Sequence, residues 1–222
     1  MAAPSRPVRN PLFARLYARV LARREPQEMR DHRVALLAGL RGRVVELGAG
    51  SGANFPHYPE TVEEVVAVEP EPYLRGRAQA AAAEAPVPVT VVDGVADALP
   101  LADGSCDAAV ACLVLCSVPD QARALSELRR VLRAPDGELR FFEHVRAQTP
   151  RAAALQRTVD RLFWPRLFGG CHTARDTGAA IAAAGFEVVD QRLFRAHGLG
   201  VPPPVAVQLQ GRARLPRAPS AV

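Results

Sequence analysis

A carboxylate, a glycine-rich turn and a second carboxylate follow one another in the first third of the chain. Glu46 ends a short apolar run, and Gly48, Gly50 and Gly52 then alternate with small residues. Glycine permits a tight turn and the close approach of a ligand to the backbone. Glu69 comes about twenty residues after Gly48, which is where a strand-end acid binds ribose hydroxyls. The spacing predicts a binding site for a nucleoside-bearing cofactor.

Two cofactors fit this turn. Residues 48–53 satisfy the dinucleotide pattern G-x-G-x-x-G/A, which would make the protein an NAD(P)-binding oxidoreductase. Glu46, however, would repel a pyrophosphate and would favour a cationic ligand, such as the ammonium and sulfonium groups of S-adenosyl-L-methionine. A further segment at 93–100 and the lack of a second domain for a hydride acceptor also favour S-adenosyl-L-methionine. A catalytically silent binding protein is the other alternative.

The four cysteines, Cys106, Cys112, Cys116 and Cys171, are too few for a disulfide scaffold. Cys112 and Cys116 lie in an apolar run without a neighbouring histidine pattern. We therefore expect buried, reduced thiols and no metal site.

Strands and helices alternate along the 222 residues. After the strand that enters the glycine turn, we expect strands at 65–69, 87–92, 108–116, 138–144, 186–194 and 205–211. Helices are expected at 11–24, 28–40, 73–84, 119–133, 151–163 and 173–184, the last capped by Thr173, and a helix could also open at Ala53. This order predicts an α/β fold, with a doubly wound, mostly parallel, seven-stranded Rossmann-like sheet.

We expect one globular domain, because 222 residues suit a single sizeable core. Residues 1–10 are expected to be disordered, 11–212 to form the domain, and 213–222 to form a loose tail. Within the domain, 11–40 would be an N-terminal helical cap and 146–172 a helical lid insertion. Trp164 and Phe168 make that lid apolar and are candidate substrate contacts.

The net charge of +5 comes from arginine alone, since the chain has no lysine. No aromatic platform accompanies the basic stretches, which argues against nucleic-acid binding. The amphipathic segment 11–24 places Leu12, Phe13 and Leu16 on one helical face and Arg15 and Arg19 on another. We expect it to pack on the domain, with weak membrane-surface contact as the alternative. No signal peptide or membrane span is visible, so a cytoplasmic location is expected.

At this point the chain resembles a known family. Residues 46–52 are similar to motif I of class I S-adenosyl-L-methionine-dependent methyltransferases, and residues 99–107 to their segment before strand four. Residues 52–59, 113–118, 142–145 and 170–175 resemble a narrower methyltransferase-like group that includes animal membrane-associated alkyl-thiol S-methyltransferases. The resemblance implies methylation of a small lipophilic acceptor, with a thiol as first candidate and a phospholipid amine or quinol at a membrane surface as the alternative.

The resemblance also implies residue roles. Glu46 would hold the methionine amino group, and Glu69 would accept from both ribose hydroxyls. The other implied cofactor contacts are Gly48, Ala49, Gly50, Gly52, Pro70, Tyr73, Val95, Ala96, Asp97, Cys112 and Leu113. Val95 stands where the family often has Asp, so Asp97 is the alternative contact for adenine.

The acceptor would need help to lose a proton, because a thiol of ordinary pKa, about 8.5, is mostly protonated at neutral pH. His144, Asp160 and His172 are the candidate catalytic groups, since they lie at or after the fifth expected strand. Arg175 is a possible charge partner and substrate contact.

Overall fold

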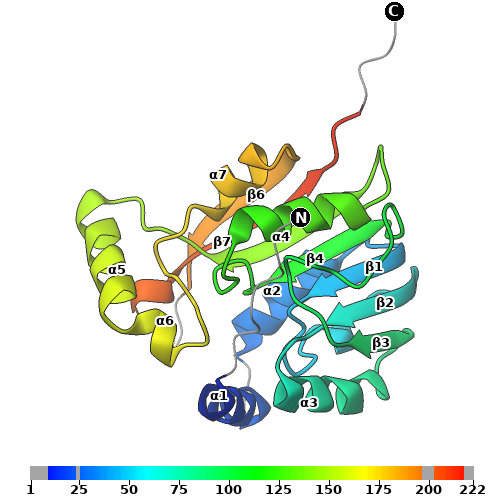
Figure 1. The fold of residues 1–222 in the computed structure, drawn as a ribbon, viewed down its shortest axis with the longest axis horizontal. Helices are drawn as coiled ribbons and strands as arrows, with labels where there is room; N and C mark the ends of the chain where they lie inside the picture. Colours follow the sequence, from blue (N-terminus) through cyan, green and yellow to red (C-terminus); the bar gives the residue numbers. More distant parts are fainter. Residues whose placement is uncertain (1–9, 24–25, 197–202, 218–222) are drawn as a thin grey trace, which may run out of the picture.

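The computed structural model describes residues 10–23, 26–196 and 203–217. Its core is a seven-stranded sheet in the order β3-β2-β1-β4-β5-β7-β6 (Figure 1). The strands are β1 (Gly42–Leu47), β2 (Val62–Val68), β3 (Val89–Val92), β4 (Ala108–Cys112), β5 (Glu138–His144), β6 (Glu187–Arg195) and β7 (Val207–Arg214). The pairs among β1 to β5 are parallel, and β7 runs antiparallel to both of its neighbours. The predicted doubly wound, mostly parallel sheet is confirmed.

The order of the strands reverses beside β1. The chain adds β2 and β3 on one side of β1 and then crosses over, so that β4 pairs with the other side. In open α/β sheets, ligands bind beyond the carboxyl ends of the strands at such a reversal. Leu47 at the end of β1 pairs with Val68 of β2 and with Ala111 of β4, so these three strands end together. This edge is where the glycine turn leaves β1.

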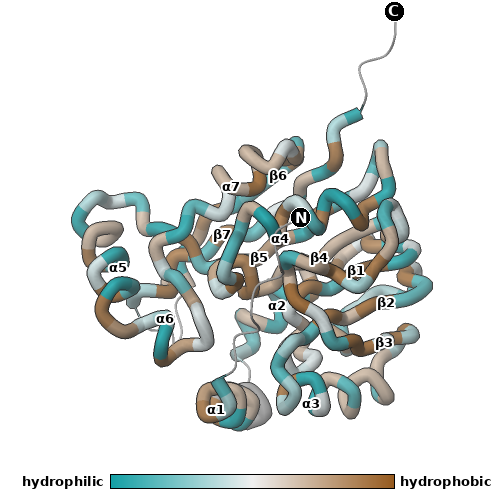
Figure 2. The backbone as a smooth tube through the Cα atoms, in the orientation of Figure 1, coloured by the Kyte–Doolittle hydropathy of each residue, from teal (hydrophilic) through white to brown (hydrophobic). Residues whose placement is uncertain are grey.

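Helices cover both faces of the sheet, which explains why every residue of β4 is buried. In Figure 1, α4 (Gln121–Val131) and α7 (Thr177–Ala183) lie on one face, and α2 (Gln27–Leu37) and α3 (Pro72–Ala82) lie on the other. Leu125, Leu128 and Ile181 pack in the first layer, and Leu36, Leu37 and Ala78 pack in the second. The central strands are accordingly the most apolar part of the backbone in Figure 2.

The predicted lid segment forms two helices at the side of the sheet, α5 (Pro150–Leu162) and α6 (Trp164–Leu167) (Figure 1). The helix α1 (Pro11–Arg23) lies beside α3. Among the described residues, no helix combines the length and the apolar character needed to cross a membrane.

The face that α1 buries differs from the predicted one. Leu12 and Leu16 are 77% and 63% exposed, whereas Ala14 and Ala18 are buried against Leu74 of α3. Small side chains let the two helices approach closely, and this close contact outweighs the larger apolar area of the leucines. The side chains of Tyr17, Val20, Leu21 and Arg23 lie outside the described residues. In α2, Val34 is 51% exposed, whereas Leu36 and Leu37 are buried.

Several predicted boundaries were wrong for local reasons. The strand expected at 108–116 ends at Cys112, because Leu113 takes a positive φ of 56° and turns the chain. The last predicted helix begins at Thr177, not Thr173, and its cap is Asp176, which accepts from the Ala179 N–H. The helix expected at Ala53 is only a short 3-10 turn, η1 (Phe55–His57).

The sheet extends past the predicted C-terminal end of the domain. β7 continues to Arg214, and the Leu215 N–H donates to the Gly137 carbonyl, so the sheet extends beyond the expected end at 212. The expectation of disorder at 1–10 falls on residues outside the described ranges, apart from Asn10, whose side chain accepts from the Phe13 N–H. The last part of the expected loose tail, 218–222, also lies outside them.

Replacing Gly48 by alanine tests whether the glycine turn requires its conformation. Gly48 has a φ of +62°, and a Cβ there would overlap the Val114 side chain. We expect Gly48→Ala to lower the free energy of unfolding by about 1–3 kcal/mol in urea denaturation. Gly76→Ala is the matched control, because Gly76 lies within α3 and a Cβ there meets nothing within 4 Å. It should stabilise the protein by up to about 1 kcal/mol. Equal effects of both changes would contradict this account.

Candidate functional site

A cavity of about 690 Å³ opens at the carboxyl ends of β1, β2 and β4. The glycine turn and Glu69 line one part of it, and His144, Trp164 and Phe168 line another. Residues of α1, including Phe13 and Leu16, complete the wall. The volume lies within the range of small-molecule and cofactor sites, about 300–1,000 Å³.

The glycine turn is held against the end of β2 by its backbone. The N–H groups of Gly48 and Ala49 both donate to the Val68 carbonyl, at 2.8 and 3.2 Å. Gly48, Ala49 and Gly50 line the cavity as predicted. Gly52 does not line it: its φ is +85°, and a Cβ there would lie 2.7 Å from the Phe55 ring. Packing against Phe55 within the turn explains why this position requires glycine. The implied contact between Gly52 and the cofactor stays a prediction.

Glu46 is buried in a polar network behind the turn. It is 2% exposed, yet it lines the cavity. Its carboxylate accepts from the Asn54 amide at 2.8 Å and from the Tyr58 hydroxyl at 2.7 Å, and Arg33 of α2 donates to the Asn54 oxygen at 2.7 Å. Burial raises the pKa of Glu46 to about 7, although these hydrogen bonds and the Arg33 charge act in the opposite direction.

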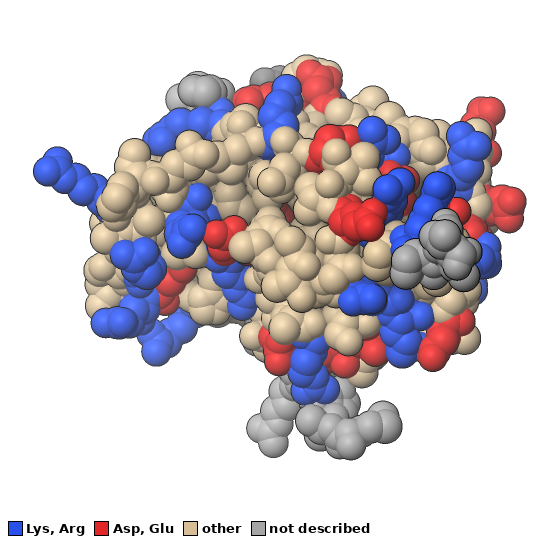
Figure 3. Space-filling model, turned by 90° about the horizontal axis from the view of Figure 1, so that it is seen from above, with Lys and Arg blue, Asp and Glu red and all other residues tan. Residues whose placement is uncertain are grey.

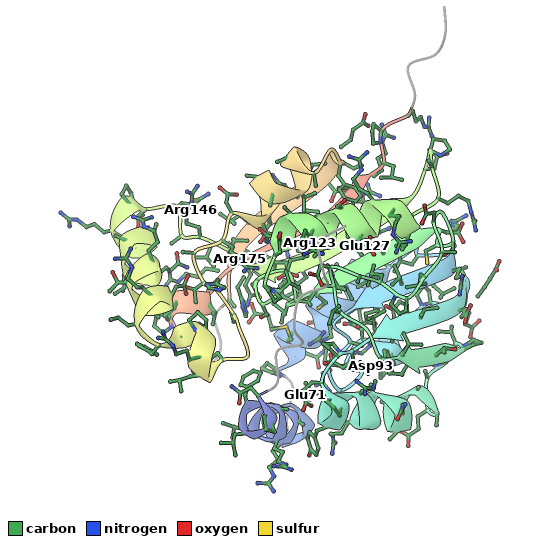
Figure 4. The ribbon with its side chains drawn as sticks, viewed as in Figure 1. Glu71, Asp93, Arg123, Glu127, Arg146 and Arg175 are labelled. Carbon is green, nitrogen blue, oxygen red and sulfur yellow. The ribbon has the colours of Figure 1, made fainter. Side chains whose placement is uncertain are left out.

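Glu69 connects the end of β2 to the glycine turn. Its two carboxylate oxygens accept from the N–H groups of Gly50 and Glu71, at 2.8 and 2.9 Å. Burial raises the pKa of Glu69 to about 7 against these bonds. Because each carboxylate oxygen has a second lone pair, the group can still accept from a ligand in the cavity. Figure 4 shows Glu71, the N-cap of α3, at this end of the strands.

Five further residues belong to the implied adenosine pocket. Val95 and Ala96 line the cavity, as does Pro70. Tyr73 does not: its ring lies below the Arg15 guanidinium, 5.8 Å from ring centroid to Cζ. Asp97 is also absent from the wall, and its carboxylate pairs with Arg123 of α4 at 3.6 Å. The structure therefore offers Val95 and Ala96, rather than Asp97, to an adenine ring.

The turn after β4 is shaped by Glu143, which is fully buried on β5. Its carboxylate accepts from three successive backbone N–H groups, those of Val114, Leu115 and Cys116, at 2.9–3.0 Å. Burial raises the pKa of Glu143, and the three N–H groups oppose that rise. Cys112 and Leu113, both implied cofactor contacts, line the cavity just before this turn. The sequence reasoning gave Glu143 no role.

The lid end of the cavity combines aromatic rings with one histidine and two thiols. Trp164 and Phe168 stack with their ring centroids 4.0 Å apart, and both line the cavity. His144 Nδ1 lies 3.9 Å from Cys116 Sγ and 3.7 Å from Cys171 Sγ, and these three residues also line it. The pKa of Cys171 is lowered, first by hydrogen bonding with the Cys116 thiol. Sequence reasoning missed the two cysteines because their histidine neighbour is distant in the chain.

The other predicted catalytic groups support the lid instead of lining the cavity. Asp160 accepts from the Thr173 N–H and hydroxyl and from the Ala174 N–H, at 2.8–3.0 Å. Arg175 donates to the Leu115 carbonyl at 2.6 Å, and Figure 4 shows it between the α4 end and the lid. Burial lowers the pKa of His172, and the Arg175 charge adds to this effect. The structure thus places Asp160, His172 and Arg175 outside the cavity wall, and their roles toward the acceptor stay predictions.

Figure 3 shows the surface above α4 and α7. Basic side chains predominate at the end where α5 lies, and both signs mix over the remainder. The cavity itself is different, since its wall carries the carboxylates of Glu46, Glu69 and Glu71. The site therefore suits a ligand with a positive group better than a pyrophosphate.

Comparison with known proteins agrees with this geometry. The profile of the family described as "Methyltransferase domain" matches residues 45–141. The chain is 37% identical to human thiol S-methyltransferase TMT1B over 158 residues, and 36% identical to human thiol S-methyltransferase TMT1A over 157. The sequence and the fold of the chain resemble those of the class I methyltransferases.

These matches cover 69% and 68% of this chain, but less than two thirds of the two human proteins, 64% and 63%. The fold is also that of the S-adenosylmethionine-dependent methyltransferase from Mesorhizobium loti, with a TM-score of 0.61 and 21% identity. That alignment covers 82% of this chain and 95% of the other. The predicted family resemblance and fold are thus confirmed.

The buried acid of the site gives a pH-dependent stability. The pKa of Glu46 rises from 4.5 to about 7 on folding, so between these values the folded state binds more protons. The free energy of unfolding should therefore fall as the pH rises from about 4.5 to about 7, by up to about 3 kcal/mol from this group. Glu46→Gln removes that loss, which urea denaturation of ligand-free protein at pH 5 and pH 8 would measure.

Glu127→Gln is the matched control. The pKa of Glu127 is lowered by its hydrogen bond with Arg130, so this group stays ionised from pH 5 to pH 8 in both states. The control should keep the wild-type change in stability over that interval. A wild-type slope in Glu46→Gln as well would show that Glu46 is not the buried, titrating acid.

Proposed function

We propose that this protein transfers the methyl group of S-adenosyl-L-methionine to a small lipophilic acceptor, with a thiol as the first candidate. The observation that carries the proposal is the single cavity that joins the glycine turn and the buried Glu69 to an apolar end at Trp164 and Phe168. A nucleoside-binding end and an acceptor-binding end are thus continuous, as direct transfer between two bound molecules requires.

The wall residues fit the cofactor. Glu69 supplies free lone pairs for the two ribose hydroxyls, and Gly50 keeps the backbone open beside it. Glu46 places negative charge where the methionine ammonium would bind. Val95 and Ala96 offer an apolar surface and backbone groups for adenine. When bound, S-adenosyl-L-methionine supplies an activated methyl group on its sulfonium, so the chain needs no covalent intermediate of its own.

The acceptor end must align a nucleophile and exclude water. The stacked rings of Trp164 and Phe168 and the buried sulfurs of Cys116 and Cys171 give this end its apolar character. His144 lies there and is the group placed to assist proton loss from the acceptor. The two human relatives are thiol S-methyltransferases, which supports a thiol acceptor here.

A phospholipid amine or quinol at a membrane surface is the second candidate. The exposure of Leu12 and Leu16 on α1, together with Arg15 on the same helix, supports weak contact with a lipid surface. This contact and a cytoplasmic location are proposals. An NAD(P)-dependent or silent protein is disfavoured by the three carboxylates in the cavity wall.

Titration calorimetry with S-adenosyl-L-methionine tests the cofactor assignment. We expect binding by the wild-type protein and a loss of about 2–3 kcal/mol of binding free energy in Glu69→Ala, because charge-assisted hydrogen bonds are removed. The change also removes acceptors for the Gly50 and Glu71 N–H groups, so thermal unfolding must be measured in parallel. Asp93→Ala is the control: Asp93 is exposed, pairs with Arg75 at the same sheet edge, and should leave affinity unchanged (Figure 4).

A panel of alkyl thiols, amines, phenols and quinols with labelled cofactor then identifies the acceptor. Label transfer to thiols supports the first candidate, whereas transfer only to amines or quinols would replace it by the second. Absence of S-adenosyl-L-methionine binding, with NAD(P) binding in its place, would contradict the proposal altogether.

A further inference from the structure

Three potential metal ligands from distant parts of the chain meet at the lid end of the cavity. Cys116 lies in the turn after β4, His144 ends β5, and Cys171 follows α6. One ligand atom from each, two sulfurs and a histidine nitrogen, lies within 4.8 Å of the others. All three residues line the cavity.

The distances suit a tetrahedral zinc ion. Bonds of about 2.3 Å to sulfur and about 2.1 Å to nitrogen place these two atoms about 3.6 Å apart at a tetrahedral angle. The observed separations from His144 Nδ1 are 3.7 Å to Cys171 Sγ and 3.9 Å to Cys116 Sγ. A shift of a few tenths of an ångström would therefore bring both nitrogen–sulfur separations to the tetrahedral value. The two sulfurs lie within 4.8 Å of each other, and a tetrahedral ion would bring them to about 3.8 Å.

The backbone around the ligands is fixed independently of any ion. Glu143, adjacent to His144, accepts from the Cys116 N–H at 3.0 Å. The His172 N–H donates to the Cys116 carbonyl at 2.7 Å, which ties the Cys171 segment to the β4 turn. The Cys171 N–H donates to the Phe168 carbonyl at 3.0 Å. These bonds hold the two cysteines on the same side of the imidazole, as a shared ion requires.

We propose that Cys116, His144 and Cys171 form a zinc site whose fourth position faces the cavity and takes the acceptor thiol as a ligand. Three protein ligands with one open position is the arrangement of catalytic, as opposed to structural, zinc sites. Soft sulfur ligands also favour zinc over magnesium or calcium. The ion would lie at the apolar end of the cavity, beside Trp164 and Cys171.

This site would solve the protonation problem of a thiol acceptor. As the acceptor sulfur becomes the fourth ligand, its S–H bond breaks, a sulfur–zinc bond forms, and the proton leaves to solvent. His144 then assists by binding the ion, without taking the proton itself. The ion is not consumed and changes no oxidation state, so no redox partner is needed. The metal site stands by itself, whereas this role in activating the acceptor rests on the proposed function.

A disulfide between Cys116 and Cys171 is the competing interpretation of the same two sulfurs. It would leave the third member, His144 Nδ1, without a purpose at nearly equal distances from both sulfurs. It would also need an oxidant, whereas a metal needs only the reduced thiols. The cysteines are free and buried, as the sequence predicts, and the proposal differs from that prediction only in assigning a metal to two of them.

The test measures metal binding without any cofactor present. Full-length reduced protein, purified without chelator or histidine tag, should take up one zinc ion per chain from added ZnCl₂, as counted by mass spectrometry after desalting. Cobalt(II) in place of zinc should give sulfur-to-metal charge-transfer absorption and the intense visible bands of a tetrahedral site. Cys171→Ser and His144→Gln should abolish stoichiometric uptake. Cys116→Ser should do the same, and Cys171→Ser carries the test if that variant does not fold.

Cys106→Ala is the matched control, because Cys106 is an equally buried thiol that does not line the cavity. It should retain one ion per chain. Addition of an alkyl thiol to the cobalt form should shift the visible bands, whereas the corresponding alcohol should leave them unchanged. Wild-type protein that stays metal-free, or a Cys171→Ser variant that binds zinc like the wild type, would overturn the site. Metal binding without a thiol-dependent shift would overturn only its role toward the acceptor. Calorimetry with S-adenosyl-L-methionine reports separately on the proposed function.

Discussion

The buried carboxylate of Glu143 is the constraint on which the site depends. It accepts from three consecutive backbone N–H groups, so it fixes the path of the chain where β4 ends and Leu113 turns with a positive φ. That path brings Cys116 to His144 and leaves room for the glycine turn opposite Val114. Burying the Glu143 carboxylate costs free energy. Removing it would cost more, because three backbone N–H donors would then be buried without an acceptor. The Glu143 side chain on β5 thus positions backbone that borders both the glycine turn and the lid end of the cavity.

Glu46 and Glu69 are also buried carboxyl groups whose burial costs free energy, but they line the cavity. Both are buried, and burial raises both pKa values to about 7. A protein selected only for stability has little reason to place two such acids beside a cavity, since each favours unfolding above neutral pH. A ligand with ribose hydroxyls and an ammonium group would offset that cost on binding. The destabilised end of the sheet is therefore the end where a charged cofactor is expected.

The sequence predicted the features that depend on local patterns, namely the strands and the glycine turn. It did not predict contacts between residues that are far apart in the chain. Apolar runs such as residues 108–112 predicted the central strands, and the spacing from Gly48 to Glu69 predicted that both residues lie at one site, where they line the same cavity. The buried face of α1 was wrong because a close helix contact selects alanine, which hydropathy ranks below leucine. The cluster of Cys116, His144 and Cys171 was missed, since no short-range spacing links residues that three separate elements bring together. Local patterns cannot report such contacts.

We propose that one cavity holds S-adenosyl-L-methionine at its glycine end and the methyl acceptor at its lid end. A crystal structure of the protein with S-adenosylhomocysteine tests this most directly. The account predicts ribose hydroxyls on Glu69, adenine against Val95 and Ala96, and the ligand sulfur directed toward His144. A nucleoside bound elsewhere, or a sulfur directed away from the His144 end, would contradict it.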